Sequence, residues 1–465
     1  MNRADLESVV AAGLIGEWPS PRVEVTGDDP IHRSTIPVGR GATAALAMVA
    51  TALDDIWAHR TGRRQQITID LRHAALALSS MWLLRADGRR AVETLMPDRA
   101  VTAGMFESSD GRRLWLQDTS PSLQAKALAA LGCERDADAV RATIASQTSA
   151  ELEQLFVEHG LTGVIVRTPD EWWQHPQGAI LREAPVVEIE RFADGPVVPL
   201  PERERPLGGL RVLEDTRVLA GPTIARTLAE FGADVLQVGA PRHIDEDLVA
   251  AMADTGHGKR RAFVDLATDG GREQARSLLA DADVFSQSYR AGSVERLGFG
   301  PDEVAAIRPG IIYVSTNCFG PRGPWTDKRG FDGNAMAASG IFSISPPDMS
   351  PDAVIAAMND YCTGYWGAYG VLRALQLRAG QGGSYHVRVS LGQTASWFLR
   401  LGTPLDATAG LSGPEMIELA HDYMEEHPSS YGLLERLRPV IQMSETAPRW
   451  DRPTVLPGTH EAVWA

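Results

Sequence analysis

The chain has 465 residues, a formal net charge of −15, and 44% hydrophobic against 23% charged residues. This length exceeds the size at which one hydrophobic core keeps growing, so we expect two or three domains of an ordinary globular protein. The acidic balance disfavours binding to nucleic acid or to an anionic membrane, because phosphate is repelled. The three cysteines, Cys133, Cys318 and Cys362, are too scattered for a disulfide framework or a zinc site. The N-terminus lacks a signal-peptide pattern and no apolar run reaches membrane-spanning length, so we predict a cytoplasmic protein.

The first 203 residues predict a helical section followed by a small α+β domain. An apolar run from Gly41 predicts a helix that ends near Gly62, and residues 66–71 then alternate as a strand does. Residues 100–200 mix short strands with helices. The proline-rich stretch 196–206 marks a domain boundary.

Apolar strands alternate with amphipathic helices from Leu210 onward. The expected strands are 210–213, 233–238, 262–266, 282–285, 311–315 and 385–391, and the expected helices are 223–231, 271–280 and 293–307. This alternation is typical of a parallel sheet with helices on both faces. We therefore predict an α/β fold, with a Rossmann-like parallel-sheet domain over residues 204–400 beside the smaller α+β domain. Residues 401–465 are expected to form a C-terminal helix and a tail that packs back on the large domain.

In such sheets, ligands bind beyond the carboxyl ends of the strands. The loops at Leu219, Ser288 and Cys318 follow three of the predicted strands, so we expect them to meet at one edge of the sheet.

One aspartate, Asp360, stands immediately ahead of an expected helix. Gly364 and Gly367 recur in that helix at helical spacing, which gives a small-residue face suited to close packing. Thr363 is a reasonable N-cap, which would place Asp360 near the positive end of the helix. That position favours an ionised carboxylate, as a nucleophile requires. The simpler interpretation is that Asp360 only caps the helix.

The order of helix, arginine, glycine and strand occurs twice in the chain. It is found around Arg60 and again around Arg378. Aligning the two arginines places Ala42 opposite Asp360. We infer an internal copy that has lost the acid.

Familiar catalytic motifs are absent from the sequence. The first strand–helix turn, Asp215–Pro222, has one glycine where a dinucleotide fingerprint needs three, so NAD and FAD are not expected. No P-loop, no G-x-S-x-G elbow and no HExxH stretch occurs. His421 and His427 are interpreted as a solvated helix face, and no metal site is predicted. Cys362 is a second candidate nucleophile at a helix start, but no histidine lies near it in sequence.

Basic residues gather where the sheet domain is expected to bind ligands. Taken singly, each is interpreted as a solvated surface charge. Together they are suited to a phosphorylated ligand such as a nucleotide or coenzyme A. The clusters are Lys259-Arg260-Arg261, Arg290 with Arg296, and Lys328-Arg329.

Several stretches carry a resemblance that covers residues 206–400 in one run. They are 206–222, 231–235, 258–260, 282–292, 295–298, 319–325 and the helix from Asp360 to Arg378. They resemble the class III coenzyme A transferase family, which includes formyl-CoA and carnitine CoA transferases and 2-methylacyl-CoA racemases. Residues 41–200 resemble the later part of the same family. The resemblance therefore implies a rearranged or fused domain order.

The resemblance implies an acyl-CoA:carboxylate CoA transferase. Asp360 matches the aspartate that attacks the thioester, and the cycle implied passes through a mixed anhydride and an aspartyl-CoA thioester. No permanently bound cofactor is implied; the coenzyme A thioester and a carboxylate acceptor are substrates, and an interlocked homodimer is expected. The positions that look like coenzyme A contacts are Leu219, Ala220, Lys259, Ser288, Tyr289, Arg290, Arg296 and Arg329.

Two other functions stay open. A 2-methylacyl-CoA racemase of the same family would need a histidine near Phe331, and phenylalanine cannot transfer protons. The other alternative is a non-catalytic protein that binds coenzyme A thioesters. The absence of an obvious glycine run to cover Asp360 favours that alternative, whereas retention of Asp360 with its spacing opposes it.

Overall fold

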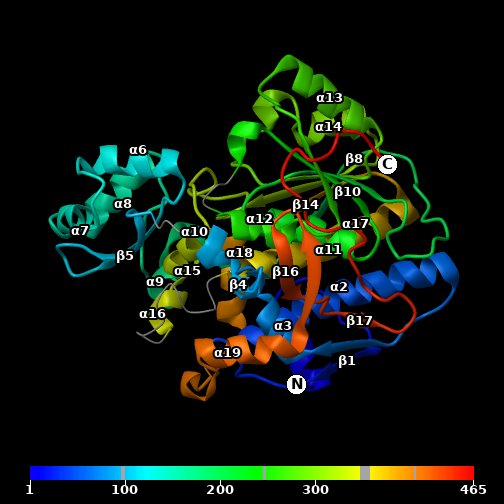
Figure 1. Cartoon of the computed structure of the whole chain (residues 1–465), viewed down its shortest axis with the longest axis horizontal. Coiled ribbons are helices and arrows are strands. Elements are labelled where there is room, and N and C mark those ends of the chain that lie inside the picture. Colours follow the sequence, from blue (N-terminus) through cyan, green and yellow to red (C-terminus); the bar gives the residue numbers. More distant parts are fainter. Residues whose placement is uncertain (96–99, 245–247, 346–356, 403–404) are drawn as a thin grey trace.

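The computed structural model describes residues 1–95, 100–244, 248–345, 357–402 and 405–465, and its centre is a large sheet. The strands of this sheet are β8 (Glu188–Ala193), β9 (Arg211–Asp215), β10 (Asp234–Gly239), β11 (Lys259–Phe263), β12 (Val284–Gln287), β13 (Ile312–Asn317) and β14 (Ser384–Ser390). Their order is β11-β10-β9-β12-β13-β14-β8; β8, β10 and β14 of this sheet are labelled in Figure 1. All neighbours are parallel except the edge pair β14–β8. Counted from β9, this is the order of doubly wound sheets, and the predicted parallel sheet is confirmed.

Helices cover both faces of the sheet, because neighbouring strand residues point to opposite sides. Val212 and Val284 belong to one core, whereas Leu213 and Phe285 belong to the other. The first core packs under α2 (Val38–Thr61), α11 (Ala220–Glu230) and α17 (Met358–Gln381). The second packs under α13 (Asp269–Ala280) and α14 (Pro301–Ile307).

Several elements of this region differ from their expected bounds; helix α11, for example, begins at Ala220 and not at residue 223. The single helix expected over 293–307 is instead a 3-10 turn, η3 (Glu295–Leu297), followed by α14. Gly298, with a φ of 83°, ends the turn, and Pro301 starts the new helix. Strand β11 begins three residues earlier than expected, at Lys259.

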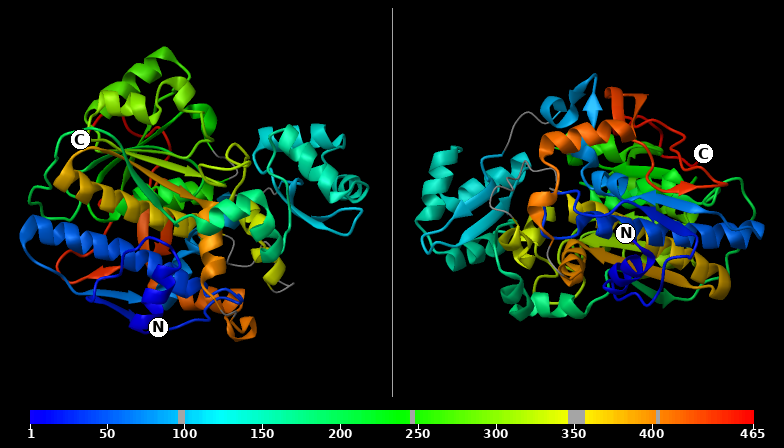
Figure 2. Two further views of the ribbon diagram at one scale, coloured as in Figure 1. Left: turned by 180° about the vertical axis from the view of Figure 1, so that it is seen from behind. Right: turned by 90° about the horizontal axis from the view of Figure 1, so that it is seen from below.

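Helices α2 and α17 are equally long and lie side by side. Each has 24 residues and is followed by a glycine with positive φ, Gly62 or Gly382. The Gln376 amide of α17 donates a hydrogen bond to the Ala52 carbonyl of α2 at 2.9 Å. In the left view of Figure 2, the blue α2 and the gold α17 run next to each other beneath the sheet.

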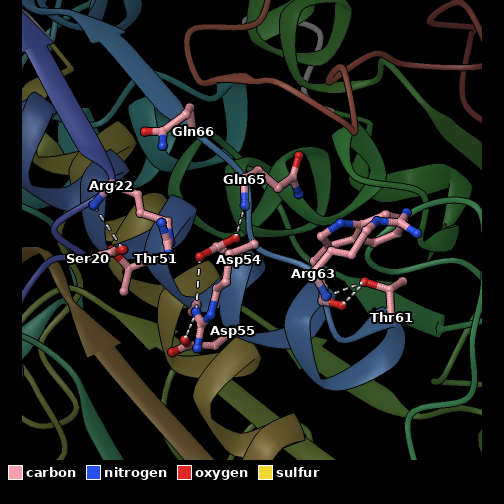
Figure 3. A network of polar contacts seen from close by, with 12 residues as sticks. Ser20, Arg22, Thr51, Asp54, Asp55, Thr61, Arg63, Gln65 and Gln66 are labelled. Atoms are coloured by element: carbon pink, nitrogen blue, oxygen red, sulfur yellow. Dashed lines mark hydrogen bonds and ion pairs between the residues drawn. The ribbon is translucent and has the colours of Figure 1, made fainter.

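A buried carboxylate fixes the turn that follows α2 (Figure 3). Asp54 is fully buried and accepts hydrogen bonds from the Gln65 backbone at 2.8 Å and from Arg64 at 3.0 Å. Such pairing satisfies a charge that would otherwise be costly to bury. The turn leads into β2 (Ile67–Asp70), which pairs with β1 (Val23–Thr26) and β17 (Gln442–Met443).

A small α+β module stands out at one side of the molecule, drawn in cyan at the left of Figure 1. Its sheet is β5 (Ala103–Glu107), β6 (Arg113–Gln117) and β7 (Val164–Ile165), covered by α6 (Pro121–Leu131), α7 (Ala137–Ala145) and α8 (Ser149–Glu158). These elements enclose a core of their own. The predicted α+β character of this section is confirmed. The chain returns through α9 (Pro169–Gln174) and α10 (Pro176–Glu183) to β8.

The two ends of the chain pack on the central layers. The C-terminal strands β15 (Met424–Ser429) and β16 (Gly432–Leu437) join β3 (Arg85–Ala86) and β4 (Arg89–Arg90) in one sheet. Structural units therefore cross the sequence boundaries at 203 and 401, since β8 also joins the large sheet. The helix face predicted for His421 and His427 is wrong, because these residues lie in a 3-10 turn and in β15.

The remaining helices complete the packing. They are α1 (Arg3–Ala11), α3 (Leu71–Ala77), α4 (Ser80–Leu83), α5 (Ala91–Leu95), α12 (Val249–Thr255), α15 (Asp332–Ser339), α16 (Ile341–Ile344), α18 (Leu391–Arg400) and α19 (Gly413–Ala420), with the 3-10 turns η1 (Pro241–His243), η4 (Ala407–Ala409) and η5 (His421–Tyr423). In the described part of the chain, no helix has both the length and the apolar character needed to cross a bilayer.

Candidate active site

A cavity of about 860 Å³ opens at the carboxyl ends of β9, β12 and β13. The predicted meeting of the three loops there is confirmed, since residues 217–218, 288–290 and 316–318 all line it. The opposite wall comes from the small module, whose residues 119–123 form the start of α6. Asp360 lies on the cavity wall with 6% of its surface exposed.

Asp360 is the third residue of α17. The helix begins at Met358 with Ala357 as N-cap, so Asp360 lies inside the first turn and not ahead of the helix. Thr363 is not the N-cap: its hydroxyl lies 2.6 Å from that of Thr394 in the interior. The Asp360 amide donates to the Asp332 carboxylate at 3.2 Å, and the Ala220 backbone donates to the Asp360 carboxylate. The starts of α17 and α11 therefore converge on Asp360.

A glycine allows the two helices to approach so closely. A Cβ atom added to Gly364 would lie 2.5 Å from the Thr223 Cβ and 3.0 Å from the Ala220 carbonyl oxygen. Both distances are shorter than an unstrained contact, so α11 would have to move. The small-residue face predicted for α17 is thus what brings the Ala220 amide to Asp360.

Burial, rather than the helix end, dominates the protonation of Asp360. Burial raises the pKa of Asp360 to about 7, although the Ala220 hydrogen bond opposes the shift. The helix position alone predicted an ionised carboxylate. A pKa of about 7 instead leaves Asp360 partly protonated near neutral pH. Burial and the charge of Asp360 also raise the pKa of Asp332 well above its ordinary value. Asp332 is held by the Asn359 side chain at 2.9 Å, so the two carboxyl groups form a buried pair.

Basic residues dominate the rest of the cavity. Among its described lining residues Asp360 is the one carboxylic acid, whereas six are basic: Lys126, Arg217, Arg242, Arg290, Lys328 and Arg329. Burial lowers the pKa of Arg329, and so does the nearby charge of Arg290. Clustered cations of this kind attract an anion strongly, even in an acidic protein.

The structure brings together six of the predicted site residues. Asp360, Ala220, Ser288, Tyr289, Arg290 and Arg329 all line the cavity. The Ser288 hydroxyl accepts the Arg217 amide at 2.8 Å, and the Tyr289 hydroxyl donates to Asp215 at 2.9 Å. These bonds shape the loops that follow β9 and β12.

Three predicted residues lie outside the cavity lining. Lys259 is fully buried 2.8 Å from Glu214 and donates to the Pro222 carbonyl, so it supports the start of α11 from behind. Burial lowers the pKa of Lys259 to about 8. Leu219 is buried as the residue that precedes α11. Arg296 lies in the turn η3.

Sequence reasoning missed the contribution of Asp332 and of the α6 start. Asp332 follows Phe331 directly, but only the fold reveals that its carboxylate accepts the Asp360 amide. The segment around Ser120 and Pro121 carries an N-cap signal that could have located a helix start, yet nothing in it indicates a cavity wall. Within the described residues, no cluster of His, Cys, Asp and Glu is arranged to hold a metal ion.

Comparison with known proteins places this site in a family. The profile described as CoA-transferase family III matches residues 10–199 and 207–421. The acetyl-coenzyme A transferase nodX of Hypoxylon pulicicidum is 32% identical over 406 residues, which are 77% of this chain and 68% of that protein. An acyl-CoA transferase of Gibberella moniliformis is 30% identical over 366 residues, 70% of this chain and 64% of that protein.

Shorter matches cover about half of the related protein. The succinate–glutarate CoA-transferase of Agrobacterium fabrum is 33% identical over 211 residues, which are 41% of this chain and 52% of that enzyme. A crystal structure of a CAIB/BAIF family protein from Brucella suis is 31% identical, with a TM-score of 0.38 over 42% of this chain and 55% of that one. Because the family profile covers most of its length, the chain belongs to CoA-transferase family III.

Proposed function

We propose that the protein transfers coenzyme A from an acyl-CoA donor to a carboxylic acid, with Asp360 as the nucleophile. The observation that carries this proposal is the position of Asp360, on the wall of a cation-rich cavity where the starts of α11 and α17 converge. Family membership and the names of the related CoA-transferases support it.

The proposed reaction consists of two exchanges at Asp360. First, a carboxylate oxygen attacks the thioester carbonyl, the C–S bond breaks, and a mixed anhydride and the coenzyme A thiolate form. The thiolate then attacks the Asp360 carbonyl carbon, so the donor acid leaves as a carboxylate and an aspartyl thioester remains. The acceptor carboxylate attacks that thioester, and the same steps in reverse give the new acyl-CoA and free Asp360. No proton is consumed overall, and neither a redox cofactor nor ATP is required.

Electrostatics around Asp360 suit both exchanges. Each attack places negative charge on a carbonyl oxygen, and backbone amides at helix starts, such as that of Ala220, stabilise such an oxyanion. Arg217, Arg290 and Arg329 lie where the phosphates of coenzyme A would meet the carboxyl ends of the strands. The small module closes the cavity within one chain; the homodimer inferred from the resemblance stays a prediction.

Racemisation is the weaker alternative. Phe331 lines the cavity at the position where the racemase resemblance requires a histidine, and it has no group to take a proton. A non-catalytic thioester-binding protein would have no use for a nucleophile that titrates near neutral pH inside the cavity.

A direct transfer assay tests the proposal. Purified protein is incubated with acetyl-CoA or succinyl-CoA together with one acid at a time (oxalate, succinate, glutarate or malate), and new thioesters are detected by mass spectrometry. Mixtures that lack either the donor or the acid are the controls. A new acyl-CoA that requires both substrates supports the transferase. Exchange of the α-proton of 2-methylacyl-CoA without transfer would favour the racemase, and binding without either reaction would favour the non-catalytic protein.

A further inference from the structure

Lys328 places a half-buried ammonium on the cavity wall, and no described residue provides it with a counter-ion. Its Nζ donates to the Gly163 carbonyl of the small module at 3.2 Å and lies 5.1 Å from the centre of the Trp325 ring. An ammonium has three N–H donors, so one contact leaves two unused. Among the described residues no carboxylate lies within ion-pair distance of this Nζ, and the nearby Glu153 is paired with Arg167 at 2.6 Å.

Lys328 and Arg329 are adjacent in sequence but face different surroundings. The charges that act on Arg329 are those of Arg290, Asp118 and Arg217, at the carboxyl ends of the strands. Those that act on Lys328 are Glu153 and Arg167 of the small module, then Cys318 and Asp118. Arg329 therefore lies in a cluster with Arg217 and Arg290, whereas Lys328 contacts the small module, and both residues line the cavity.

Lys328 lines the same cavity as Asp360 and Cys318. Burial raises the pKa of the Cys318 thiol, Asp360 raises it further, and Lys328 lowers it, so both charged groups act on this one sulfur. Trp325 is buried with Arg167 5.1 Å from its ring centre, which holds the Lys328 loop against the small module. Burial also lowers the pKa of Lys328 to about 8.

We propose that Lys328 binds the carboxylate of the acceptor acid and so sets the specificity of the second exchange. This rests on the proposed function, since it assigns the arginine cluster to the phosphates of coenzyme A and leaves Lys328 for the acid. A carboxylate is the anion that fits: two free N–H donors and a positive charge match its two oxygens. Lys328 is thus a binding residue and takes no part in bond breaking.

The test separates loading of Asp360 from its discharge. Wild type, K328M, K328R and R290M are incubated with acyl-CoA alone, and the covalent adduct is measured by intact-protein mass spectrometry. The best acceptor of the transfer assay is then titrated, and the concentration that discharges half of the adduct is recorded. We expect K328M to load as wild type does but to need roughly 10- to 100-fold more acceptor, the usual loss for one charge-assisted hydrogen bond. K328R should recover part of that loss, and R290M should instead require more acyl-CoA for loading.

The outcomes separate the two claims. If wild type forms no adduct with any donor, the proposed function fails. If wild type loads but K328M discharges at the wild-type acceptor concentration, the assignment of Lys328 fails while the transferase stands. K328M can instead lose loading and discharge equally, or fail to fold. In either case K328R decides, and equal impairment of loading and discharge in K328R overturns the assignment.

Discussion

Helices α2 and α17 have the same length and similar contacts at both ends, but they carry different side chains in their first turns. Both have 24 residues, and the arginine near each C-terminus donates to a glycine carbonyl at 3.1 Å, Arg60 to Gly208 and Arg378 to Gly310. An aspartate also holds each first turn. Asp29 accepts the Arg40 amide at 2.7 Å, as Asp332 accepts the Asp360 amide at 3.2 Å. The scaffold of the site therefore exists twice.

The third residue of each helix marks the difference. Counted from the helix starts, Arg40 stands opposite Asp360, whereas alignment of the two arginines places Ala42 there. The two counts differ by two residues because Arg60 lies closer to the end of its helix than Arg378 does. Arg40 turns to Asp28 in an ion pair of 2.8 Å, whereas Asp360 faces the cavity. In the proposed function, this side chain is what distinguishes the reactive helix from its structural copy.

Removal of the Asp360 carboxylate should have the largest effect. We expect D360N to lose transfer activity by roughly 10³-fold or more, since the proposed covalent intermediate forms on Asp360. The matched variant on the other helix, R40A, should keep full activity and cost less than about 1 kcal/mol of stability, because its ion pair is half exposed. Initial rates and urea unfolding measure both. A comparable loss of activity in R40A would break the comparison.

The pH dependence should be the next largest effect. Because burial raises the pKa of Asp360 to about 7, loading should fall about tenfold per unit as pH drops below 7. The free energy of unfolding should change with pH in the opposite direction to the loading rate. A pKa of Asp360 that is raised in the folded state stabilises the fold at low pH, and this contribution is lost as the pH rises to about 7. D360N should therefore gain stability relative to wild type over that range. A loading rate that stays flat from pH 5 to 8 would contradict the assigned protonation.

Loss of the aspartates that hold the first turns should have a smaller effect. D332A leaves the Asp360 amide without its acceptor, so the nucleophile shifts and loading should slow by roughly 10- to 100-fold. D29A should lower the free energy of unfolding by about 1 kcal/mol without slowing the reaction. Equal activity of the two variants would show that Asp332 has only a structural role.

The smallest effect is expected at the helix contact. Gly364 of α17 corresponds to Ala44 of α2, counted from the helix starts. G364A should push α11 away from α17 and lower the free energy of unfolding by about 1–3 kcal/mol through overpacking. Loading should also slow, because the Ala220 amide moves away from Asp360. A44G should cost about 0.5–1 kcal/mol as an interior helix glycine and leave activity unchanged. Denaturation midpoints and loading rates of the pair check this.

The sequence was sufficient for those features that depend on local pattern. Strand and helix alternation predicted the parallel sheet, and topology predicted the edge at which the Ser288 and Cys318 loops meet. It could not reveal features that depend on packing across the chain. The protonation of Asp360 depends on burial, the role of Asp332 on a hydrogen bond to a residue far along the chain, and the wall at Ser120 on how the small module docks. The burial of Lys259 could not be predicted for the same reason, since its partner Glu214 lies on another strand.

The most direct test of the central claim is the covalent state of the peptide that contains Asp360. After incubation with acyl-CoA and trapping with hydroxylamine or borohydride, peptide mass spectrometry should locate the modification on Asp360 and find the α2 peptide with Arg40 unmodified. Wild-type protein that turns over while Asp360 remains unmodified, or an adduct on Cys362 instead, would contradict this account.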